Sequence, residues 1–198
     1  MNYKTIKILL NNSIEDECSD YLLFACEQSN KLYNSTLFMV RQAHFETCPT
    51  TNYFDKNDLI RCCFKLTKVK LCYAQLCKQL KVNRHYQAIG GSQAQKTIKS
   101  VVEGFKAYNK LLPMWFKGQL KDRPKLPNYR KNGLYQVAFT GQNLKFSLDS
   151  KFCYLSIART QKDELFSDKL TIPCPPEINQ ENIAELRIIP SLGKLWAE

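Results

Sequence analysis

The stretch LRIIPSLGKLWAE, residues 186–198, predicts a strand, a turn around Gly193 and a returning strand. At the other end of the chain, YKTIKILL, Tyr3–Leu10, alternates imperfectly between apolar and polar residues and predicts another strand. Because the two ends of a domain often lie close together, we expect this first strand to join the late strands in one barrel-like sheet. The returning strand stops after a few residues, so we expect a fragment, a truncated gene product or a degenerate reading frame.

Between these two ends, the apolar pattern is first helical and then strand-like. Apolar residues recur three or four apart over Asp16–Phe45, Leu59–Leu80 and Ser92–Leu112, so each stretch predicts an amphipathic helix. Ser92 and Gln95 have the spacing of a capping box at the start of the third helix. Five short strand-like runs follow, namely LYQVAF, LKFSL, CYLSIA, KLTI and ELRIIP.

The order of these segments predicts an α+β fold. We expect a β-barrel-like domain that carries an inserted helical domain of three or more helices. Residues 1–14 would hold the first strand, residues 15–112 the helical insertion, and residues 113–198 a basic loop and the remaining strands. The chain of 198 residues is 44% hydrophobic, which is ample for a packed core.

The positive charge of the chain is concentrated in its middle. The net charge is +11 at pH 7, yet Lys56–Lys131 alone contains 18 basic and 3 acidic residues, a net charge of +15. The two flanks hold 11 basic and 15 acidic residues, a net charge of −4. Charge confined to one stretch repels itself in the folded state and indicates an acidic partner, nucleic acid first and a membrane surface second.

Several classes of protein do not fit the sequence. No stretch approaches the roughly 20 continuous apolar residues of a membrane-spanning helix, and the N-terminus lacks the pattern of a signal peptide, so we expect a cytoplasmic protein. The nine cysteines contain no C-x-x-C motif and are odd in number, which supports neither zinc binding nor a disulfide framework. Cys62, Cys63 and Cys77 fall on the apolar face of the second helix, where core packing explains them. The two histidines, His44 and His85, receive no role.

Three stretches together resemble a known family. They are ACEQSNKLYNSTLFMVRQ (25–42), SQAQKTIKSVVEGFKAYNKLL (92–112) and KDRPKLPNYRKNGLYQVAFTGQNLKF (121–146). The chain is similar, over most of its length, to the N-terminal half of the transposon-encoded OrfB/TnpB proteins of the IS200/IS605 and IS607 type, which are relatives of the type V CRISPR effector nucleases. The resemblance implies an RNA-guided DNA endonuclease, with a wedge β-barrel and a helical recognition insertion that bind guide RNA and target DNA.

The resemblance also implies parts that this sequence does not contain. Full-length relatives use magnesium in a RuvC-like nuclease domain, where three carboxylates hold the metal ions, and zinc in a four-cysteine finger. We expect both domains to be absent from this chain, with no cofactor, no metal site and no catalytic residue of its own. As given, the chain is expected not to cut DNA.

Two sets of basic residues are candidates for phosphate contact. In the first set, Pro124 and Pro127 stiffen an extended segment next to Trp115 and Tyr129, which favours RNA or DNA binding over a merely solvated charge run. The second set lies on the third helix, where a charged outer face is also the ordinary feature of an amphipathic helix. The first set is Lys117, Lys121, Arg123, Lys125, Arg130 and Lys131, and the second is Lys96, Lys99 and Lys106.

The resemblance nominates three further residues, Tyr53, Gln95 and Thr140, for reading a short motif adjacent to the target. They match positions that in this family lie against the duplex next to the target. Each residue also has a structural explanation, because Gln95 can close the capping box, Tyr53 can cover helix ends and Thr140 can support a strand turn. The chemistry of these side chains permits base reading as well as a structural role, since a glutamine amide can bond bidentately to adenine.

Two other functions stay open. One is a stand-alone DNA-binding regulator that needs no guide and places TIKSVVEGFKAYNK in a major groove in the manner of a helix-turn-helix protein. The other is a transposase that cuts and joins strands itself, although no tyrosine with paired histidines and no acidic triad is evident.

Overall fold

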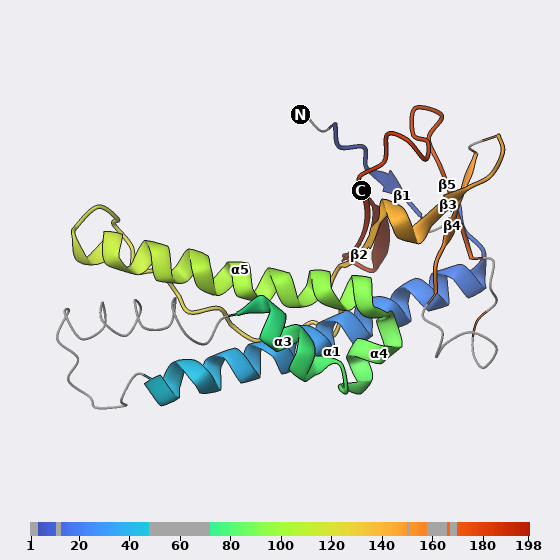
Figure 1. Cartoon of the computed structure of the whole chain (residues 1–198). Helices are drawn as coiled ribbons and strands as arrows, with labels where there is room; N and C mark the ends of the chain where they lie inside the picture. The colour runs from blue at the N-terminus through green and yellow to red at the C-terminus, as the bar shows by residue number, and fades with distance from the viewer. Residues whose placement is uncertain (1–3, 11–12, 48–71, 150, 158–165, 167–169) are drawn as a thin grey trace. The chain divides into compact units, whose positions relative to one another are not determined.

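The computed structural model describes residues 4–10, 13–47, 72–149, 151–157, 166 and 170–198, and it combines helices with strands (Figure 1). The α+β class is therefore confirmed. The strands fall into a four-stranded sheet of order β1-β7-β6-β2 and a three-stranded sheet of order β3-β4-β5. The helices α1, α3, α4 and α5 lie between β1 and β2 in the chain.

The predicted C-terminal hairpin is confirmed. Strands β6 (Glu185–Ser191) and β7 (Lys194–Ala197) pair in antiparallel orientation, with Ser191 opposite Lys194. The two turn residues, Leu192 and Gly193, have φ angles of 51° and 71°. Positive φ at both central residues is the requirement of a type I′ turn, whose twist matches that of the flanking strands.

The predicted joining of the first and last strands is also confirmed. Strand β1 (Ile8–Leu9) pairs with β7 so that Ile8 lies opposite Ala197. The backbone N–H of Leu10 extends the pairing by donating to the carbonyl of Leu195 at 3.0 Å. On the other side of the hairpin, β2 (Val137–Thr140) pairs with β6.

The expectation of a barrel is wrong for the residues that the structure describes. Strands β3 (Leu144–Phe146), β4 (Phe152–Leu155) and β5 (Thr171–Pro173) make a separate antiparallel sheet. Between β2 and β3, the chain turns through the 3-10 helix η1 (Gly141–Asn143). This turn takes the chain out of the first sheet, and among the described residues no strand pair joins the two sheets into a closed barrel.

The helices agree with the sequence pattern in part. Helix α1 runs over Asp16–Thr47, two residues beyond the predicted end. Of the second predicted helix, the described part is α3 (Tyr73–Leu80), and its predicted beginning lies outside the described residues. Helix α4 (Arg84–Ile89) was not predicted, because six residues are too few to show a period; Asn83 caps it by accepting a hydrogen bond from the N–H of His85.

Helix α5 extends beyond both predicted ends, over Gly91–Phe116. It continues past Pro113 and ends in a Schellman motif centred on Gly118, two residues after Phe116. Gly118 has a φ of 75° and donates to the carbonyl of Trp115, while the N–H of Gln119 donates to the carbonyl of Met114. A proline near a helix end was therefore a poorer stop signal than the glycine that follows it.

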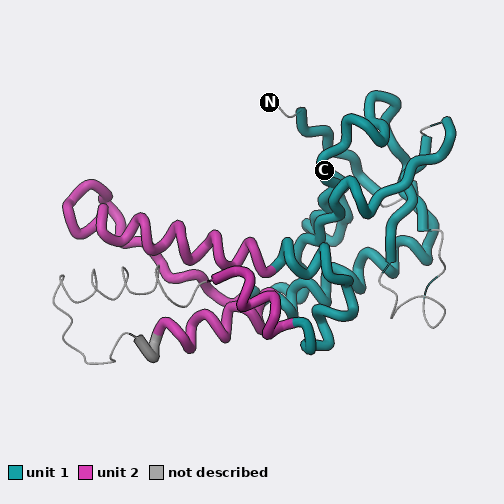
Figure 2. The backbone as a smooth tube through the Cα atoms, viewed as in Figure 1, with its two compact units in different colours: residues 1–32, 81–97, 130–198 teal, residues 33–80, 98–129 magenta. Residues whose placement is uncertain are grey.

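The chain divides into two compact units (Figure 2). Unit 1 comprises residues 1–32, 81–97 and 130–198, and unit 2 comprises residues 33–80 and 98–129. Within unit 1, the hydroxyl of Ser29 lies 2.9 Å from both the hydroxyl of Thr97 and the carbonyl of Gln136, which ties α1 to α5 and to the approach of β2. The three segments predicted from the sequence, 1–14, 15–112 and 113–198, remain a prediction.

Buried cysteines belong to the core, as expected. Cys77 is buried in unit 2, whereas Cys62 and Cys63 lie outside the described residues. In unit 1, burial raises the pKa of the Cys26 thiol to about 12 and that of the Cys153 thiol to about 12 as well. These thiols are protonated at neutral pH and behave as small apolar side chains.

The core of unit 2 contains a histidine whose titration should make the unit sensitive to acid. His44 is buried against the rings of Phe105 and Tyr108, and burial, then the charge of Arg41, lower its pKa below the ordinary value of 6.5. His44 is therefore protonated at a higher pH in the unfolded chain than in the folded chain. Its contribution to stability is complete above pH 6.5 and is lost as the pH falls below that value.

We expect the free energy of unfolding of the wild type to fall between pH 7.5 and pH 5.5 by at most about 1.4 kcal/mol per pH unit through this group. The variant His44→Leu places an apolar side chain that does not titrate at this position. Its free energy of unfolding should therefore change less with pH than that of the wild type. Urea unfolding followed by Trp115 fluorescence in a Trp196→Phe background measures unit 2. Equal pH slopes in the two proteins would exclude His44 as the cause.

Candidate nucleic-acid interface

The basic segment, residues 117–131, is held against the rest of unit 2 by its apolar residues. It forms no helix or strand, yet Leu126 packs against the buried side chains of Tyr108 and Leu112. A Cβ atom placed on Gly104 would lie 3.7 Å from Cγ of Pro127, so the proline lies directly over that glycine of α5. The extended conformation predicted for this segment is therefore fixed by packing as well as by its prolines.

All six basic residues predicted in this segment are exposed. Apolar side chains at positions 124, 126 and 127 are partly buried, and the basic side chains between and around them point to solvent. The segment contains one acidic residue, Asp122. The exposed basic residues are Lys117, Lys121, Arg123, Lys125, Arg130 and Lys131.

Three guanidinium groups in and around the segment lie over aromatic rings. In unit 2, Arg123 lies 5.5 Å from the centroid of Trp115, and Arg41 lies 5.1 Å from that of Tyr129. In unit 1, Arg130 lies 3.9 Å from the centroid of the Tyr135 ring. Each contact contributes about 0.5–1 kcal/mol at an exposed site. It restricts the motion of the arginine side chain, which keeps its positive charge. Arg41 had no sequence signal, because its partner is far away in the chain.

The compact units differ strongly in charge. Unit 2 contains 14 basic and 5 acidic residues, a net charge of +9, whereas unit 1 contains 15 basic and 13 acidic residues, a net charge of +2. Most of the excess charge of the protein is therefore carried by unit 2, which includes most of the basic segment. The basic residues of Lys56–Lys70 contribute to this sum, although they lie outside the described residues.

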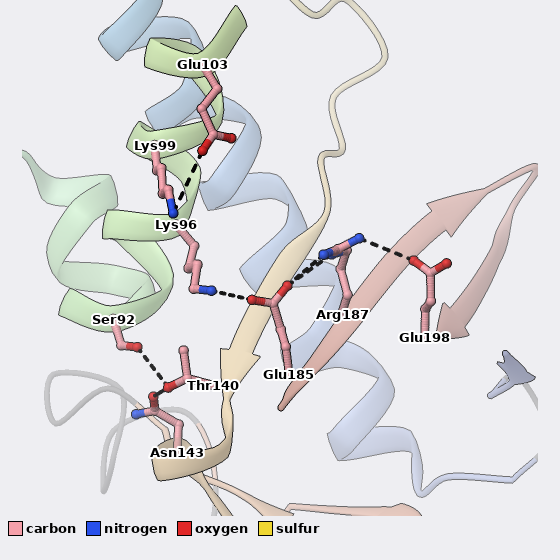
Figure 3. Close-up of polar contacts among 9 residues, drawn as sticks. All are labelled: Ser92, Lys96, Lys99, Glu103, Thr140, Asn143, Glu185, Arg187 and Glu198. Carbon is pink, nitrogen blue, oxygen red and sulfur yellow. Dashed lines mark hydrogen bonds and ion pairs between the residues drawn. The ribbon is translucent and has the colours of Figure 1, made fainter. Parts of the chain in front are cut away.

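The candidate lysines of α5 differ in what surrounds them. Lys96 is half-buried and forms an ion pair with Glu185, and Lys99 lies 3.8 Å from Glu103 one helical turn away (Figure 3). Lys106 is exposed, with no ion pair to another described residue. Lys96 is thus already neutralised within the fold, which makes it a poorer phosphate ligand than Lys106 or the basic segment.

The partner of Lys96 belongs to a longer charge network on the four-stranded sheet. Glu185 also accepts a hydrogen bond from Arg187 at 2.8 Å, and Arg187 lies 3.5 Å from Glu198 (Figure 3). Desolvation opposes ionisation of Glu185, but the hydrogen bonds from Lys96 and Arg187 outweigh it and lower the pKa of this carboxyl. The network alternates in sign and adds no net positive surface for a polyanion.

The structure places one of the three candidate reading residues in the lining of a groove in unit 1 and a second one next to that lining. The groove has a volume of about 740 Å³ and lies between the α4–α5 junction and the β3–β4 sheet. Gln95 lines it directly. Thr140 does not line the groove but contacts two residues that do, because its hydroxyl lies 3.4 Å from that of Ser92 and 2.7 Å from Oδ1 of Asn143. The third residue, Tyr53, lies outside the described residues.

The capping box predicted for Ser92 and Gln95 does not form. Helix α5 begins at Gly91, so Ser92 lies inside the helix, and the side chain of Gln95 donates to the hydroxyl of Tyr86 at 3.4 Å. This places Gln95 on an exposed face at the groove, free of the structural role that the sequence suggested. The groove lining is rich in amides and hydroxyls, contributed by Gln87, Ser92, Gln95, Asn143 and Ser156.

The corner at Thr140 is fixed by hydrogen bonds and close packing. The N–H of Gly141 donates to the carbonyl of Ala184 at 3.2 Å, and the side chain of Gln180 donates to the carbonyl of Gly141. A Cβ atom on Gly141 would lie 3.0 Å from the carbonyl oxygen of Ile183, which is closer than ordinary contact, so a larger residue here would have to displace that backbone. Asn143 follows in the same turn; a T-G-Q-N turn was the signal that could have identified it.

Other kinds of site are not seen in the part of the chain that the structure describes. No group of three or more His, Cys, Asp or Glu side chains is arranged to hold a metal ion there. Within the same residues, no helix has both the length and the hydropathy to cross a bilayer. No protein-family model matches the chain, and no curated protein matches its sequence.

Proposed function

We propose that this chain is the nucleic-acid-binding portion of a TnpB-like, RNA-guided DNA endonuclease, responsible for recognition of guide RNA and target DNA. The proposal rests on the resemblance of residues 25–42, 92–112 and 121–146 and on the charge of unit 2. It assigns binding to this chain and no catalytic step. In such a system, base pairing with the guide reads most of the target, and the protein contributes backbone contacts and a short adjacent motif.

One observation carries the binding part of the proposal. The basic segment buries Leu126 and Pro127 and exposes all six of its candidate basic side chains. Like charges held on a fixed backbone repel one another in the free protein, and phosphates relieve that repulsion while releasing counterions. The guanidinium group of Arg123 is exposed and contacts Trp115 through its flat face, so its N–H groups can donate to phosphate oxygens.

The groove of unit 1 supports a different kind of contact. Apart from Lys81, the polar side chains that line it are neutral, and neutral donors and acceptors suit base edges better than phosphates. Gln95 and Thr140 therefore serve as candidates for reading the adjacent motif in the duplex. We propose that the two sheets belong to the wedge domain and that the helices between β1 and β2 are the recognition insertion.

The test is to purify the whole chain and analyse the nucleic acid that accompanies it. We expect RNA to co-purify, and we expect the affinity for added RNA to fall steeply as the salt concentration rises, because counterions return to the phosphates. A protein that carries no RNA and binds added RNA and DNA weakly, or without dependence on salt, would contradict the proposal.

A second outcome distinguishes the guide-free regulator. If the protein binds one duplex sequence tightly after thorough treatment with RNase, then no guide RNA is needed, and the helix-turn-helix-like alternative is favoured. If duplex binding requires the co-purified RNA, the RNA-guided function is favoured.

A further inference from the structure

We propose that the outer face of the three-stranded sheet is a stacking platform for two unpaired bases of single-stranded RNA, carried by Phe152 and Tyr154. This inference rests on the proposed function, because it names a place where unpaired bases of the bound RNA lie. The platform belongs to unit 1 and shares no residue with the basic segment or with the lining of the groove near Gln95.

Strand β4 has one buried face and one outer face. Cys153 and Leu155 are each 3% exposed and belong to the core, whereas Phe152 is 44% exposed and Tyr154 is half-buried. Successive side chains of a strand point to opposite faces of the sheet, so both aromatic rings lie on the outer face.

The register of the strands identifies the neighbours of the two rings. Tyr154 lies opposite Lys145 of β3 and Thr171 of β5. Phe152 lies opposite Pro173 of β5. None of these residues carries a carboxylate, and the one charge among them is positive. Phosphates that approach beside the rings therefore meet no repulsion from this face.

The hairpin of β3 and β4 fixes the position of Phe152 before any ligand binds. The N–H of Phe152 donates to the hydroxyl oxygen of Ser147 at 3.1 Å, and the N–H of Ser147 donates to the carbonyl of Phe152 at 3.0 Å. On the β5 side, the N–H of Cys174 donates to the carbonyl of Lys151 at 2.8 Å. Asp149, the one carboxylate of the hairpin, accepts from Ser147 and from the N–H of Lys151 in the turn. A ring on a preorganised backbone loses little conformational entropy on binding.

The spacing of the two rings suits an extended, unpaired strand. Residues two apart on a β-strand are separated by about 7 Å, roughly twice the rise of about 3.4 Å between neighbouring nucleotides of one strand in a duplex. Two bases that lie on Phe152 and Tyr154 are therefore unstacked from each other and do not belong to a continuous duplex. Because every base has a flat face, the platform distinguishes unpaired from paired RNA and has little sequence preference.

The size of the face also favours RNA over a protein partner. A stable protein interface buries about 800 Å² on each partner, and one aromatic side chain supplies at most about 250 Å². The apolar side chains of this face are Phe152, Tyr154 and Pro173, and the last two are half-buried. Such a small apolar area suffices for two bases and is too small for a stable protein interface.

The test is fluorescence anisotropy on the whole chain, stripped of nucleic acid, with a labelled single-stranded RNA and with an RNA duplex of the same length. The variant Phe152→Leu keeps an apolar side chain opposite Pro173 and removes the flat ring. We expect it to bind the single strand roughly fivefold to a hundredfold more weakly, the range for one lost stacking contact, and to bind the duplex as the wild type does. Its salt dependence should not change, because stacking neutralises no phosphate.

Three further variants make the result decisive. Phe152→Trp supplies another flat ring and should keep the wild-type affinity for the single strand. Leu148→Ala removes an exposed apolar side chain of the same hairpin and should have no effect. Tyr154→Leu should behave as Phe152→Leu does, and it serves in its place if Phe152→Leu does not fold.

Two results would overturn the platform and leave the proposed function standing. They are unchanged binding of the single strand by both leucine variants, and an equal loss of affinity for single strand and duplex. A wild type that binds neither RNA would instead overturn the proposed function, and this inference with it.

Discussion

Replacing Lys117, Lys121, Arg123 and Lys125 together by glutamine should weaken nucleic-acid binding and remove much of its salt dependence. The four side chains are exposed on a segment whose backbone is anchored by Leu126, so their loss should change charge and leave the fold intact. Each phosphate contact contributes about 0.7–0.9 to the slope of log affinity against log salt, so the slope should fall by about 3. Between 50 and 200 mM salt, the wild type should then lose roughly 50- to 100-fold more affinity than the variant.

The measurement is fluorescence anisotropy with a labelled RNA of arbitrary sequence, at four salt concentrations, on protein stripped of nucleic acid. A matched control removes four exposed lysines of unit 1, namely Lys4, Lys145, Lys151 and Lys194. It carries the same net charge as the variant and should keep nearly the wild-type slope. If both proteins lose the same slope, overall charge and not the basic segment governs binding.

Replacing Phe105 by alanine should cost unit 2 about 3–5 kcal/mol of unfolding free energy, the loss that is usual for a fully buried phenylalanine. Phe105 is 0% exposed, and its ring packs 6.3 Å from that of His44. It also lies on the face of α5 that buries Val101 and Val102. The substitution leaves a cavity that the rigid helices can only partly close.

Urea unfolding measures this loss unit by unit, because the protein contains two tryptophans, Trp115 in unit 2 and Trp196 in unit 1. A Trp196→Phe background leaves Trp115 as the reporter for Phe105→Ala. The matched control is Lys106→Ala, the next residue of α5, which is exposed and should change stability by less than about 0.5 kcal/mol. A loss below about 1 kcal/mol for Phe105→Ala would show that this helix face is not packed as described.

Local features of the fold were predictable where the residues that decide them are neighbours in the chain. The turn at Leu192 and Gly193 needs two residues with positive φ, and a glycine between two apolar runs is a direct signal for it. Helix α1 shows its period over 32 residues. The pairing of β1 with β7 followed from the tendency of chain ends to meet, although β1 has only two residues.

Short or unusual elements were not predictable in the same way. Helix α4 is six residues long, and its cap, Asn83, is a weak signal without a period behind it. Helix α5 passes Pro113, an expected stop signal, and is capped instead by hydrogen bonds at Gly118 and Gln119. The 3-10 turn at η1 separates β2 from β3, so the strands make two sheets where their sequence pattern indicated one barrel.

By itself, the sequence determined the class of the fold, the position of the helices between the first and the late strands, and the concentration of positive charge in Lys56–Lys131. These properties depend on composition and on patterns within a few residues of chain. Only the tertiary structure decided which basic residues are already paired, since Lys96 meets Glu185 across 89 positions, and which lie exposed beside partly buried neighbours. It also decided that Thr140 gives its proton to Asn143, because donor and acceptor roles depend on distances that exist only after the chain has folded.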